Sequence, residues 1–409
     1  MLQELKILAV LFLSLSVAAC GGGGGGGGGT PAGGAPAGKV WFVDNSFAGT
    51  SDGSQTAPFR TLAAATAVAA ANETIFVFRG DGTATGQDAG VTLAAGQKLI
   101  GQGVPLVVGG VTLVPAAATP PVITNASVAP VVTLAGSNTE VAGLAIQGSG
   151  TNNIGILGNA VTGFNIHDNT LTGLSREPIS LPNGGGVGQI VRNQIVNNAA
   201  AGASGNAVDI VTNAAGAAFT VSDNTIQDAA STGIRILFNG GGGTVGVLRN
   251  SVPSFGVQDA QRRGIDIDAS LGAVVTSTIE GNTVDAAGAN GPRAGIQVNA
   301  TTGGRHTVLM NNNTASNSPA APAEGGIQVT VSDATSSICL RMAGNATNSG
   351  VLLDNSVAVS TALRAEGTVA APTQAGFEGA NPGVTAPPGF QYLPNAAGIS
   401  FVPAGTCGP

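Results

Sequence analysis

The stretch GIDIDASLGAVVTSTIEGNTV, residues 264–284, decides the fold. Its beginning alternates apolar and polar residues, which indicates a strand with Ile265 and Ile267 pointing inward and Asp266 pointing outward. Its end, TIEGNTV, has Ile279 before Asn282 and Val284 two residues after it. Both runs are too short to be helices. The stretch therefore predicts short strands joined by Gly- and Ala-rich turns.

Both motifs of this stretch recur along the chain. A small residue followed by apolar-x-apolar occurs as GIL (155–157), PISL (178–181), AVDI (207–210), GIRI (233–236), GIDI (264–267) and GIQV (295–298 and 326–329). The second motif supplies Asn169, Asn193, Asn224, Asn250, Asn282, Asn313 and Asn345, which are 24 to 32 residues apart. The motifs alternate strictly, as in a solenoid, where each coil packs on its neighbours and insertions become loops.

This arrangement resembles a known superfamily. Residues 75–355 are similar to the right-handed parallel β-helix, or pectin-lyase-like, proteins. The resemblance implies an all-β, single-stranded right-handed parallel β-helix of nine or ten coils, on the order of 45 Å long at ~4.8 Å per rung. It also implies that the seven asparagines form an asparagine ladder. Asparagine suits this role because it tolerates left-handed turns and its amide both donates and accepts.

The two ends of the chain differ from the repeats. Residues 39–79, with a helix predicted at 62–71, resemble the N-terminal cap of many β-helix proteins. We expect Trp41 and the phenylalanines of this cap to form its core rather than a ligand platform. The β-helix proper is assigned to residues 80–355. The Pro- and Gly-rich residues 356–409 are predicted to be a C-terminal cap or tail laid over the last coil, because exposed sheet ends invite aggregation.

The N-terminus predicts export and lipid attachment. Residues 1–19 read as a signal peptide whose apolar run is too short to span a bilayer. Val17-Ala18-Ala19-Cys20 resembles a bacterial lipobox, in which the cysteine is lipidated; the alternative is an ordinary secretory signal. Residues 20–38 read as a flexible tether with a root-mean-square span of about 21–25 Å. By resemblance, Gly21 after the cysteine favours the outer membrane.

Two cysteines remain after Cys20, namely Cys339 and Cys407. An even pair in an oxidising compartment predicts a disulfide, which would hold the Pro-rich tail against the last strands. The alternative is two free thiols.

Charge is scarce throughout the chain. Only 9% of the residues are charged, and 15 Lys and Arg against 22 Asp and Glu give a net charge of −7. Nucleic acid is therefore not expected as a partner, because its binding proteins carry a basic surface.

The outward positions of the repeated strands hold the candidate site. They form the columns Ser180, Asp209, Arg235, Asp266, Gln297, Gln328 and, two residues further on, Val211, Leu237, Asp268, Asn299, Thr330. Asp266 and Asp268 are expected on one face, about 6.5–7 Å apart along the strand. Arg235 lies on an adjacent rung, and Arg263, with Arg262, lies just before the same strand.

This grouping has a functional and a structural interpretation. Inverting glycosidases separate their carboxyl groups by ~6.5–9.5 Å, so Asp266, Asp268, Arg235 and Arg263 are the candidate catalytic residues. The carboxylates and nearby arginines could also hold Ca²⁺ against an acidic polysaccharide; no other cofactor is predicted. Alternatively, Asp209, Arg235 and Asp266 form a charge ladder that stabilises the sheet.

Several signatures of β-helix enzymes are missing. The only lysines after Cys20 are Lys39 and Lys98, outside the repeat columns, and the polygalacturonase pattern is not found. We expect His167 and His306 to lie on loops or solvated faces rather than to form a pair. The repeats contain few aromatic residues, which weakens a carbohydrate function.

Three functions remain open. The first is a lipid-anchored cell-envelope protein that acts as a binding or adhesive module for carbohydrate or another envelope component. The second is a polysaccharide lyase or glycoside hydrolase with an acidic site on the outer face of one sheet. The third is a structural spacer.

Overall fold

The computed structural model describes residues 38–149, 153–196, 205–257, 262–285, 294–316, 325–355, 357, 361–367, 373–384, 389–393 and 398–407. The predicted signal peptide, Cys20 and the tether up to residue 37 lie outside the described residues. Gly38–Pro409 forms one compact unit. None of its described helices is both long and apolar enough to span a membrane.

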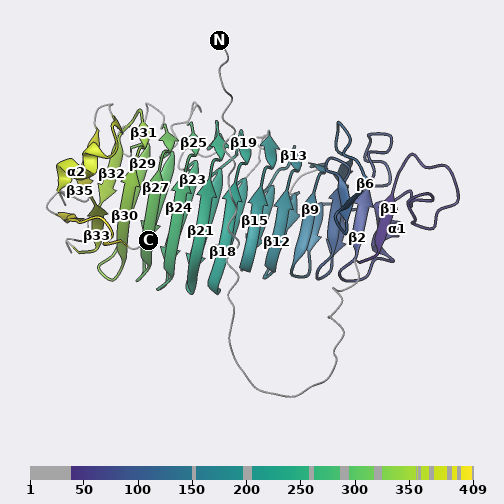
Figure 1. Ribbon diagram of the computed structural model, residues 1–409, viewed down its shortest axis with the longest axis horizontal. Helices are drawn as coiled ribbons and strands as arrows, with labels where there is room; N and C mark the ends of the chain where they lie inside the picture. Colours follow the sequence, from purple (N-terminus) through teal and green to yellow (C-terminus); the bar gives the residue numbers. More distant parts are fainter. Residues whose placement is uncertain are drawn as a thin grey trace, which may run out of the picture. The chain divides into compact units, whose positions relative to one another are not determined.

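Three parallel sheets form the walls of this unit (Figure 1). The first has thirteen strands: β1 Val40–Val43, β2 Thr74–Val77, β4 Lys98–Gly101, β9 Thr139–Ala142, β12 Thr162–His167, β15 Gly185–Val191, β18 Ala215–Ser222, β21 Gly242–Leu248, β24 Val274–Glu280, β27 Arg305–Asn311, β30 Ser337–Ala343, β33 Leu363–Glu366 and β36 Ser400–Val402.

The second sheet has ten shorter strands: β7 Val122–Thr124, β10 Ala145–Gln147, β13 Thr170–Thr172, β16 Gln194–Val196, β19 Thr225–Gln227, β22 Ser251–Val252, β25 Thr283–Val284, β28 Thr314–Ala315, β31 Ala346–Thr347 and β34 Gly383–Val384. The third has eleven: β3 Val91–Leu93, β8 Val132–Leu134, β11 Ile156–Leu157, β14 Ile179–Pro182, β17 Val208–Thr212, β20 Ile234–Asn239, β23 Ile265–Ser270, β26 Ile296–Ala300, β29 Ile327–Val331, β32 Val351–Asp354 and β35 Phe390–Leu393.

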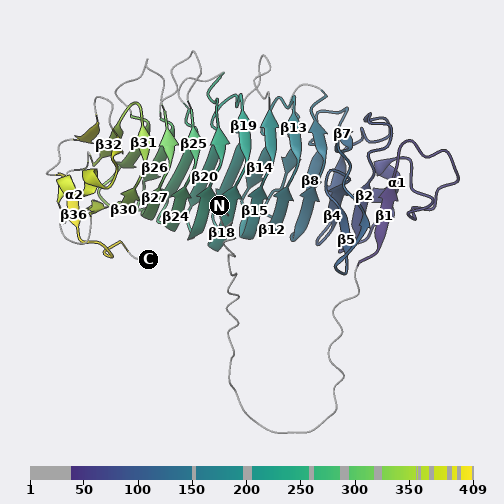
Figure 2. The ribbon, with the colours of Figure 1, turned by 45° about the horizontal axis from the view of Figure 1, so that its top comes forward.

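The chain visits the three sheets in turn, so each circuit adds one rung to each wall (Figure 2). This confirms the predicted parallel β-helix. The smallest of these three sheets has ten strands, as expected for nine or ten coils, whereas the thirteen-stranded sheet is longer because strands of both ends join it.

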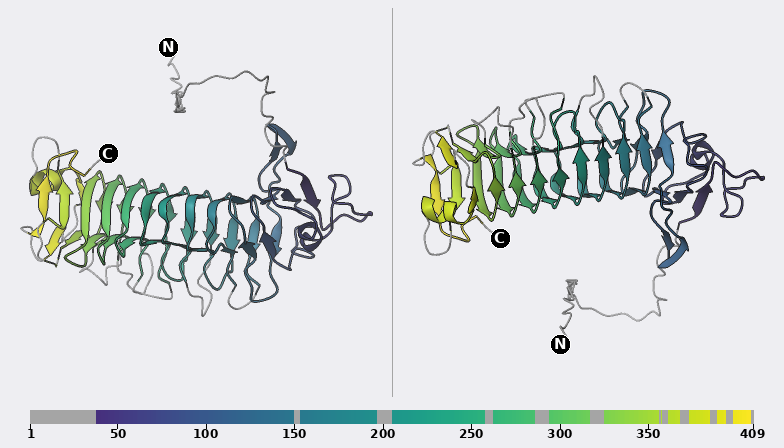
Figure 3. Two further views of the ribbon diagram at one scale, coloured as in Figure 1. Left: turned by 90° about the horizontal axis from the view of Figure 1, so that it is seen from below. Right: turned by 90° about the horizontal axis from the view of Figure 1, so that it is seen from above.

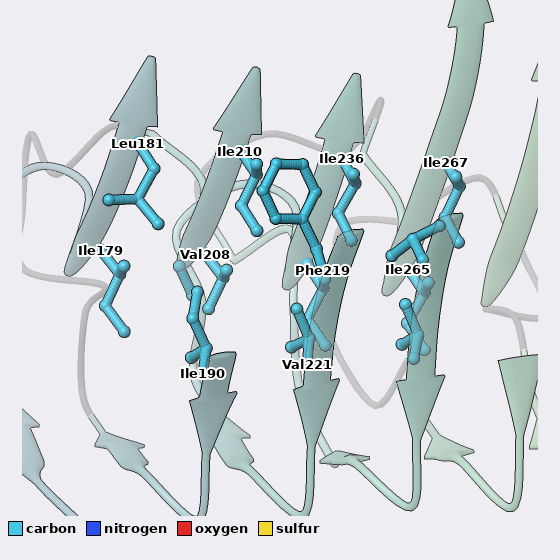
Figure 4. Packing of buried hydrophobic residues seen from close by; sticks show 14 of the residues in the cluster. Ile179, Leu181, Ile190, Val208, Ile210, Phe219, Val221, Ile236, Ile265 and Ile267 are labelled. Atoms are coloured by element: carbon cyan, nitrogen blue, oxygen red, sulfur yellow. The ribbon is translucent and has the colours of Figure 1, made fainter. Parts of the chain in front are cut away.

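The core is a stack of inward-facing aliphatic side chains between the walls (Figure 4). Ile265 and Ile267 are fully buried, which confirms their predicted orientation. Phe219 lies 5.9 Å from Phe164 and 6.0 Å from Phe238, measured between ring centroids, and all three rings are buried. These phenylalanines of the repeats are therefore used inside the coils.

The N-terminal cap contains a helix shorter than predicted. α1 spans Leu62–Thr66, with Thr61 as its N-cap, and does not continue to residue 71. Beyond Thr66, side chains bond to backbone groups that would otherwise pair within a longer helix. Gln97 donates to the carbonyl oxygens of Ala69 and Ala70, and the Glu73 carboxylate accepts from the N–H of Ala70 at 2.7 Å. The aromatic residues form cap core, as expected, with Trp41 stacked on Phe59 at 5.7 Å.

The C-terminal segment also differs from the prediction. Instead of only covering the last coil, its strands β33, β34, β35 and β36 extend all three sheets, and α2 (Gln374–Gly379) buries Phe377 beside them. The predicted disulfide is present: Cys339 and Cys407 are joined, with 5.3 Å between their Cα atoms. The buried Glu366 carboxylate accepts from the N–H groups of Gly405 and Cys407, both at 2.9 Å. The tail is thus part of the solenoid.

The predicted asparagine ladder is confirmed and extends one rung further, to Asn381. From Asn193 onward, each amide oxygen accepts two bonds from the preceding ladder residue; Asn250 Oδ1, for example, accepts from the N–H and the Nδ2 of Asn224 at 3.1 and 3.0 Å. The ladder asparagines do not adopt the left-handed conformation. The residue before each ladder asparagine up to Asn345 does, from Asp168 (φ 54°) to Gly344 (φ 66°), whereas Ala380, before Asn381, is right-handed (φ −71°).

Charged residues occupy several of these left-handed positions, which the sequence reasoning missed. Arg192 forms two hydrogen bonds to Asp168 at 2.8 and 2.7 Å, and Arg249 forms two to Asp223 at 2.7 and 2.8 Å. The Arg249 guanidinium holds the pKa of Asp223 below its ordinary value. These bidentate pairs join neighbouring coils at turns where a side chain is conformationally unfavourable.

The expected loop or solvated face was wrong for His306, whereas His167 lies on the outer face of β12. His306 faces inward from β27 and is buried, with a ring nitrogen 2.9 Å from the Ser277 hydroxyl. Burial lowers its pKa to about 4. His167 is half-buried and lies between the carboxylates of Glu140 (3.0 Å) and Asp168 (2.7 Å). Burial opposes protonation of His167, but these two bonds raise its pKa overall.

Replacing His306 by glutamine is expected to reduce the acid sensitivity of the fold. The unfolded chain binds a proton near the ordinary pKa of 6.5, but the folded one only near 4. Unfolding is therefore favoured as the pH falls between these values. One pKa unit corresponds to about 1.4 kcal/mol. Between pH 7.5 and 4.5, the free energy of unfolding of the parent should therefore fall by about 2–3 kcal/mol more than that of the variant. Urea unfolding of both proteins at these pH values measures this; equal losses would contradict it.

Candidate functional site on the outer face of the eleven-stranded sheet

Strands β20, β23, β26 and β29 bring the outward-facing columns into register. Arg235, Asp266, Gln297 and Gln328 stand on successive rungs, and Leu237, Asp268, Asn299 and Thr330 form the adjacent column. The strands form here because inward-facing Ile, Val and Ala alternate with these polar residues. The sheet thus carries carboxylates and amides at ~4.8 Å intervals along its outer face.

Asp266 is an outward-facing carboxylate that is nevertheless only 5% exposed. Its Oδ2 lies 3.7 Å from Nη1 of Arg263, and its Oδ1 has no hydrogen-bond partner among the residues that the structure describes. Burial, supported by the nearby charge of Asp268 and opposed by Arg263, raises the pKa of Asp266 to about 7. Asp266 is therefore poised between its neutral and ionised forms at physiological pH.

Asp268 is bonded to the next rung. Asn299 Nδ2 donates to Asp268 Oδ1 at 2.5 Å, and Gln297 Nε2 donates to Asn299 Oδ1 at 2.7 Å. Burial raises the pKa of Asp268, although the Asn299 bond opposes the shift. Asp268 is thus hydrogen-bonded to the amides, and Asp266 is linked to Asp268 electrostatically.

Three of the four predicted catalytic residues lie together in the structure, and the fourth has a different partner. Asp266, Asp268 and Arg263 lie together, whereas Nη1 of Arg235 pairs with Oδ1 of Asp209 at 3.1 Å. That pair fits the alternative charge-ladder interpretation. Arg262 is exposed, and the connecting loops at 258–261 and 286–293 lie outside the described residues.

A groove of about 310 Å³ runs over the same face. It is lined by Leu237, Asn239, Asp268, Ser270, Gln297, Asn299, Thr301, Gln328, Thr330 and Ser332. Most of these side chains carry an amide, hydroxyl or carboxyl group, and none is aromatic. No role was predicted for these amides and hydroxyls, although Gln297 and Gln328 at one outward position of successive rungs were a usable signal.

Four side-chain oxygens near this groove are buried without a hydrogen-bond partner in the part of the chain that the structure describes. They are Asp266 Oδ1, Gln297 Oε1, Gln328 Oε1 and Thr330 Oγ1. A buried polar atom without a partner costs about 1–3 kcal/mol. Water or a ligand with hydroxyl groups could provide the missing donors.

A larger groove, of about 500 Å³, lies on the ten-stranded sheet between Thr283, Thr314 and Thr347. None of its lining residues has a buried atom without a partner in the described part of the chain. The smaller groove therefore has the stronger chemical claim to be a binding site.

Metal binding has little support at the candidate site. Asp266 and Asp268 supply two carboxylates, but Ca²⁺ takes 6–8 oxygen ligands. No group of three His, Cys, Asp or Glu that could hold a metal occurs among the residues with described positions.

Residues 154–340 match the family model for the right handed beta helix region, and the solenoid is accordingly a right-handed parallel β-helix. A solved structure of a rhamnogalacturonan lyase is similar at 12% identity with a TM-score of 0.26, over 80% of this chain and 74% of that one. At this identity and score, the likeness does not bear on function. Curated protein sequences give no match.

Proposed function

We propose that this chain is a lipid-anchored β-helix protein of the bacterial outer membrane that binds a polysaccharide along the groove on the eleven-stranded sheet. The observation that carries the proposal is the row of buried oxygens without partners beside this groove. Sugar hydroxyls both donate and accept, so they complement carboxylate, amide and hydroxyl groups.

The groove also has a repeat that suits an extended polymer. Asp268, Asn299 and Thr330 stand on consecutive rungs at ~4.8 Å intervals. A chain lying along the solenoid would therefore meet one such group at each rung. The lack of an aromatic platform favours recognition by hydrogen bonds rather than by stacking.

Binding to pectins, alginates and glycosaminoglycans tests this proposal. We expect purified Gly38–Pro409 to bind at least one of them in calorimetric titrations. Replacing both Asn299 and Thr330 by alanine removes two polar groups that line the groove. Binding should therefore weaken at least tenfold, which corresponds to about 1.4 kcal/mol of binding free energy.

The matched control replaces Thr283 and Thr314, which line the other groove, by alanine and should bind like the parent. No binding to any of the polysaccharides would favour the spacer. Equal weakening in both variants would contradict the assignment of the groove.

A second candidate function is hydrolysis at Asp266 and Asp268. The raised pKa of Asp266 favours it, because a general acid must hold a proton near neutral pH. In an inverting glycosidase, Asp266 would protonate the leaving oxygen while Asp268 activates water. Reducing-end and 235 nm absorbance assays on the same polysaccharides test this, and turnover should disappear in Asp266→Asn.

The lipid anchor is tested separately. Mass spectrometry of the mature protein from a bacterial host should show an acylated N-terminal Cys20. A mature N-terminus at another residue, without lipid, would support the ordinary secretory signal.

A further inference from the structure

The groove on the eleven-stranded sheet is polar but carries little charge. Of the ten described residues that line it, Asp268 alone is charged, and eight of the others carry an amide or a hydroxyl group. These side chains form columns along the length of the solenoid, because successive rungs stack in this direction (Figure 3). A polymer that lies in the groove therefore meets mainly uncharged groups.

The arginines nearest to the groove already face carboxylates. Nη1 of Arg235 lies 3.1 Å from Oδ1 of Asp209, and Nη1 of Arg263 lies 3.7 Å from Oδ2 of Asp266. Arg262 precedes β23 and is not one of the lining residues. Among the described residues, no cation lines the groove to pair with a carboxylate or sulfate group of a ligand.

Carboxylates in the same columns oppose an anionic ligand. Asp266 and Asp268 stand on β23, and Asp354 on β32 follows Thr330 in the column of Asp268. Burial raises the pKa of Asp268, although the Asn299 bond and the nearby arginines oppose this shift. A carboxylate brought by a ligand would disfavour ionisation of this group further, because like charges repel at short range.

The buried oxygens beside the groove lack donors. Oδ1 of Asp266, Oε1 of Gln297 and Oε1 of Gln328 accept no hydrogen bond from any residue that the structure describes. The orientation of the Gln297 amide is fixed, because its Nε2 donates to Oδ1 of Asn299. Sugar hydroxyls can donate to such oxygens, whereas an ionised carboxylate can only accept.

We propose that this groove selects an uncharged polysaccharide and excludes polymers of uronic or sulfated sugars. The inference rests on the proposed function, because it names the class of polysaccharide that the groove binds. A polymer with ammonium groups fits less well, since Arg263 lies beside Asp266 and three of the four unpartnered oxygens belong to uncharged side chains. Among the pectins, the highly methylesterified form meets the requirement, because its carboxyl groups are esters.

Calorimetric titration of Gly38–Pro409 with two forms of one pectin tests the inference. Highly methylesterified pectin should bind at least tenfold more tightly than the same polymer after enzymatic de-esterification. Neutral galactan, mannan and xylan, acidic alginate and cationic chitosan complete the series, and binding should be confined to neutral members. The inference is overturned, and the proposed function stands, if a charged polymer binds in the groove as tightly as the best neutral one. No binding to any polymer overturns both.

A variant of the groove distinguishes charge from shape. Asn239 lines the groove at the exposed end of β20, so replacing it by lysine adds a cation without burying it. In low salt, Asn239→Lys should bind de-esterified pectin at least tenfold more tightly than the parent does. NaCl at ~1 M, where the Debye length is about 3 Å, should remove this gain.

The matched control is Asn239→Gln, which adds length without charge and should bind both pectins like the parent. Circular dichroism should be the same for all three proteins. If both variants gain affinity for the acidic polymer, or if neither does, its exclusion is not electrostatic and the inference fails.

Discussion

Replacing Asn250 by alanine is expected to lower the free energy of unfolding by about 2–6 kcal/mol. In the parent, Asn250 Oδ1 accepts from two donors of Asn224, and Asn250 Nδ2 donates to the carbonyl oxygen of Val221 at 2.8 Å. These groups are buried inside the turn. Losing the amide leaves both donors without an acceptor, at about 1–3 kcal/mol for each buried group. Urea unfolding followed by circular dichroism measures the effect.

The control for this prediction is Asn165→Ala. Asn165 faces outward from β12 and is partly exposed, so its replacement should change stability by less than about 0.5 kcal/mol. Similar effects of the two substitutions would contradict the structural importance of the ladder.

Replacing Asp266 by asparagine is expected to stabilise the protein by up to about 4 kcal/mol at pH 8. The unfolded chain releases the Asp266 proton near the ordinary pKa of 3.8, whereas the folded one holds it until about 7. Folding is therefore opposed increasingly as the pH rises between these values, at about 1.4 kcal/mol per pKa unit. The neutral amide avoids this cost. Below pH 4, parent and variant should be nearly equally stable.

Thermal and urea unfolding at pH 4 and pH 8 check this result. Asp209→Asn is the matched control, because Asp209 stands in the same column but is bonded to Arg235 and Asn206. It should be neutral or destabilising at pH 8. If Asp266→Asn is also destabilising there, Asp266 belongs to a charge ladder and not to a functional site. A stabilised variant would show that Asp266 lowers the free energy of unfolding of the parent protein.

The repeats allowed the architecture to be predicted because stacking imposes the same requirement on every coil. An apolar residue must face inward, as Ile265 and Ile267 do. A buried amide at each turn must hydrogen-bond to the neighbouring coils, as that of Asn282 does. The end of α1 was mispredicted because Gln97, distant in sequence, and Glu73 bond to backbone groups of Ala69 and Ala70, just beyond the helix. The antiparallel hairpin of β5 (Leu106–Val108) and β6 (Val111–Val114) was not predicted. It packs on the outward-facing Phe42 and Phe76 and does not belong to a repeated coil.

The candidate site was only partly predictable. Period-two alternation placed Asp266 and Asp268 on one outer face, which the structure confirms. It could not show that outward-facing Asp266 is buried, because alternation predicts the orientation of a side chain but not which residues cover it. His306 was mispredicted although its alternation with Val308 and Met310 on β27 directs it inward. Arg235 was assigned to Asp266 by adjacency, but Asp209 on the preceding strand provides its partner.

Carboxylate labelling with a carbodiimide tests the central claim most directly, namely that the groove on the eleven-stranded sheet binds a polysaccharide. Modification of Asp268, which lines the groove, is compared by mass spectrometry with that of Asp285 on the ten-stranded sheet, with and without saturating ligand. We predict that the ligand lowers the modification rate of Asp268 severalfold and leaves Asp285 unchanged. Unchanged labelling of Asp268, or protection of Asp285 alone, would contradict the claim.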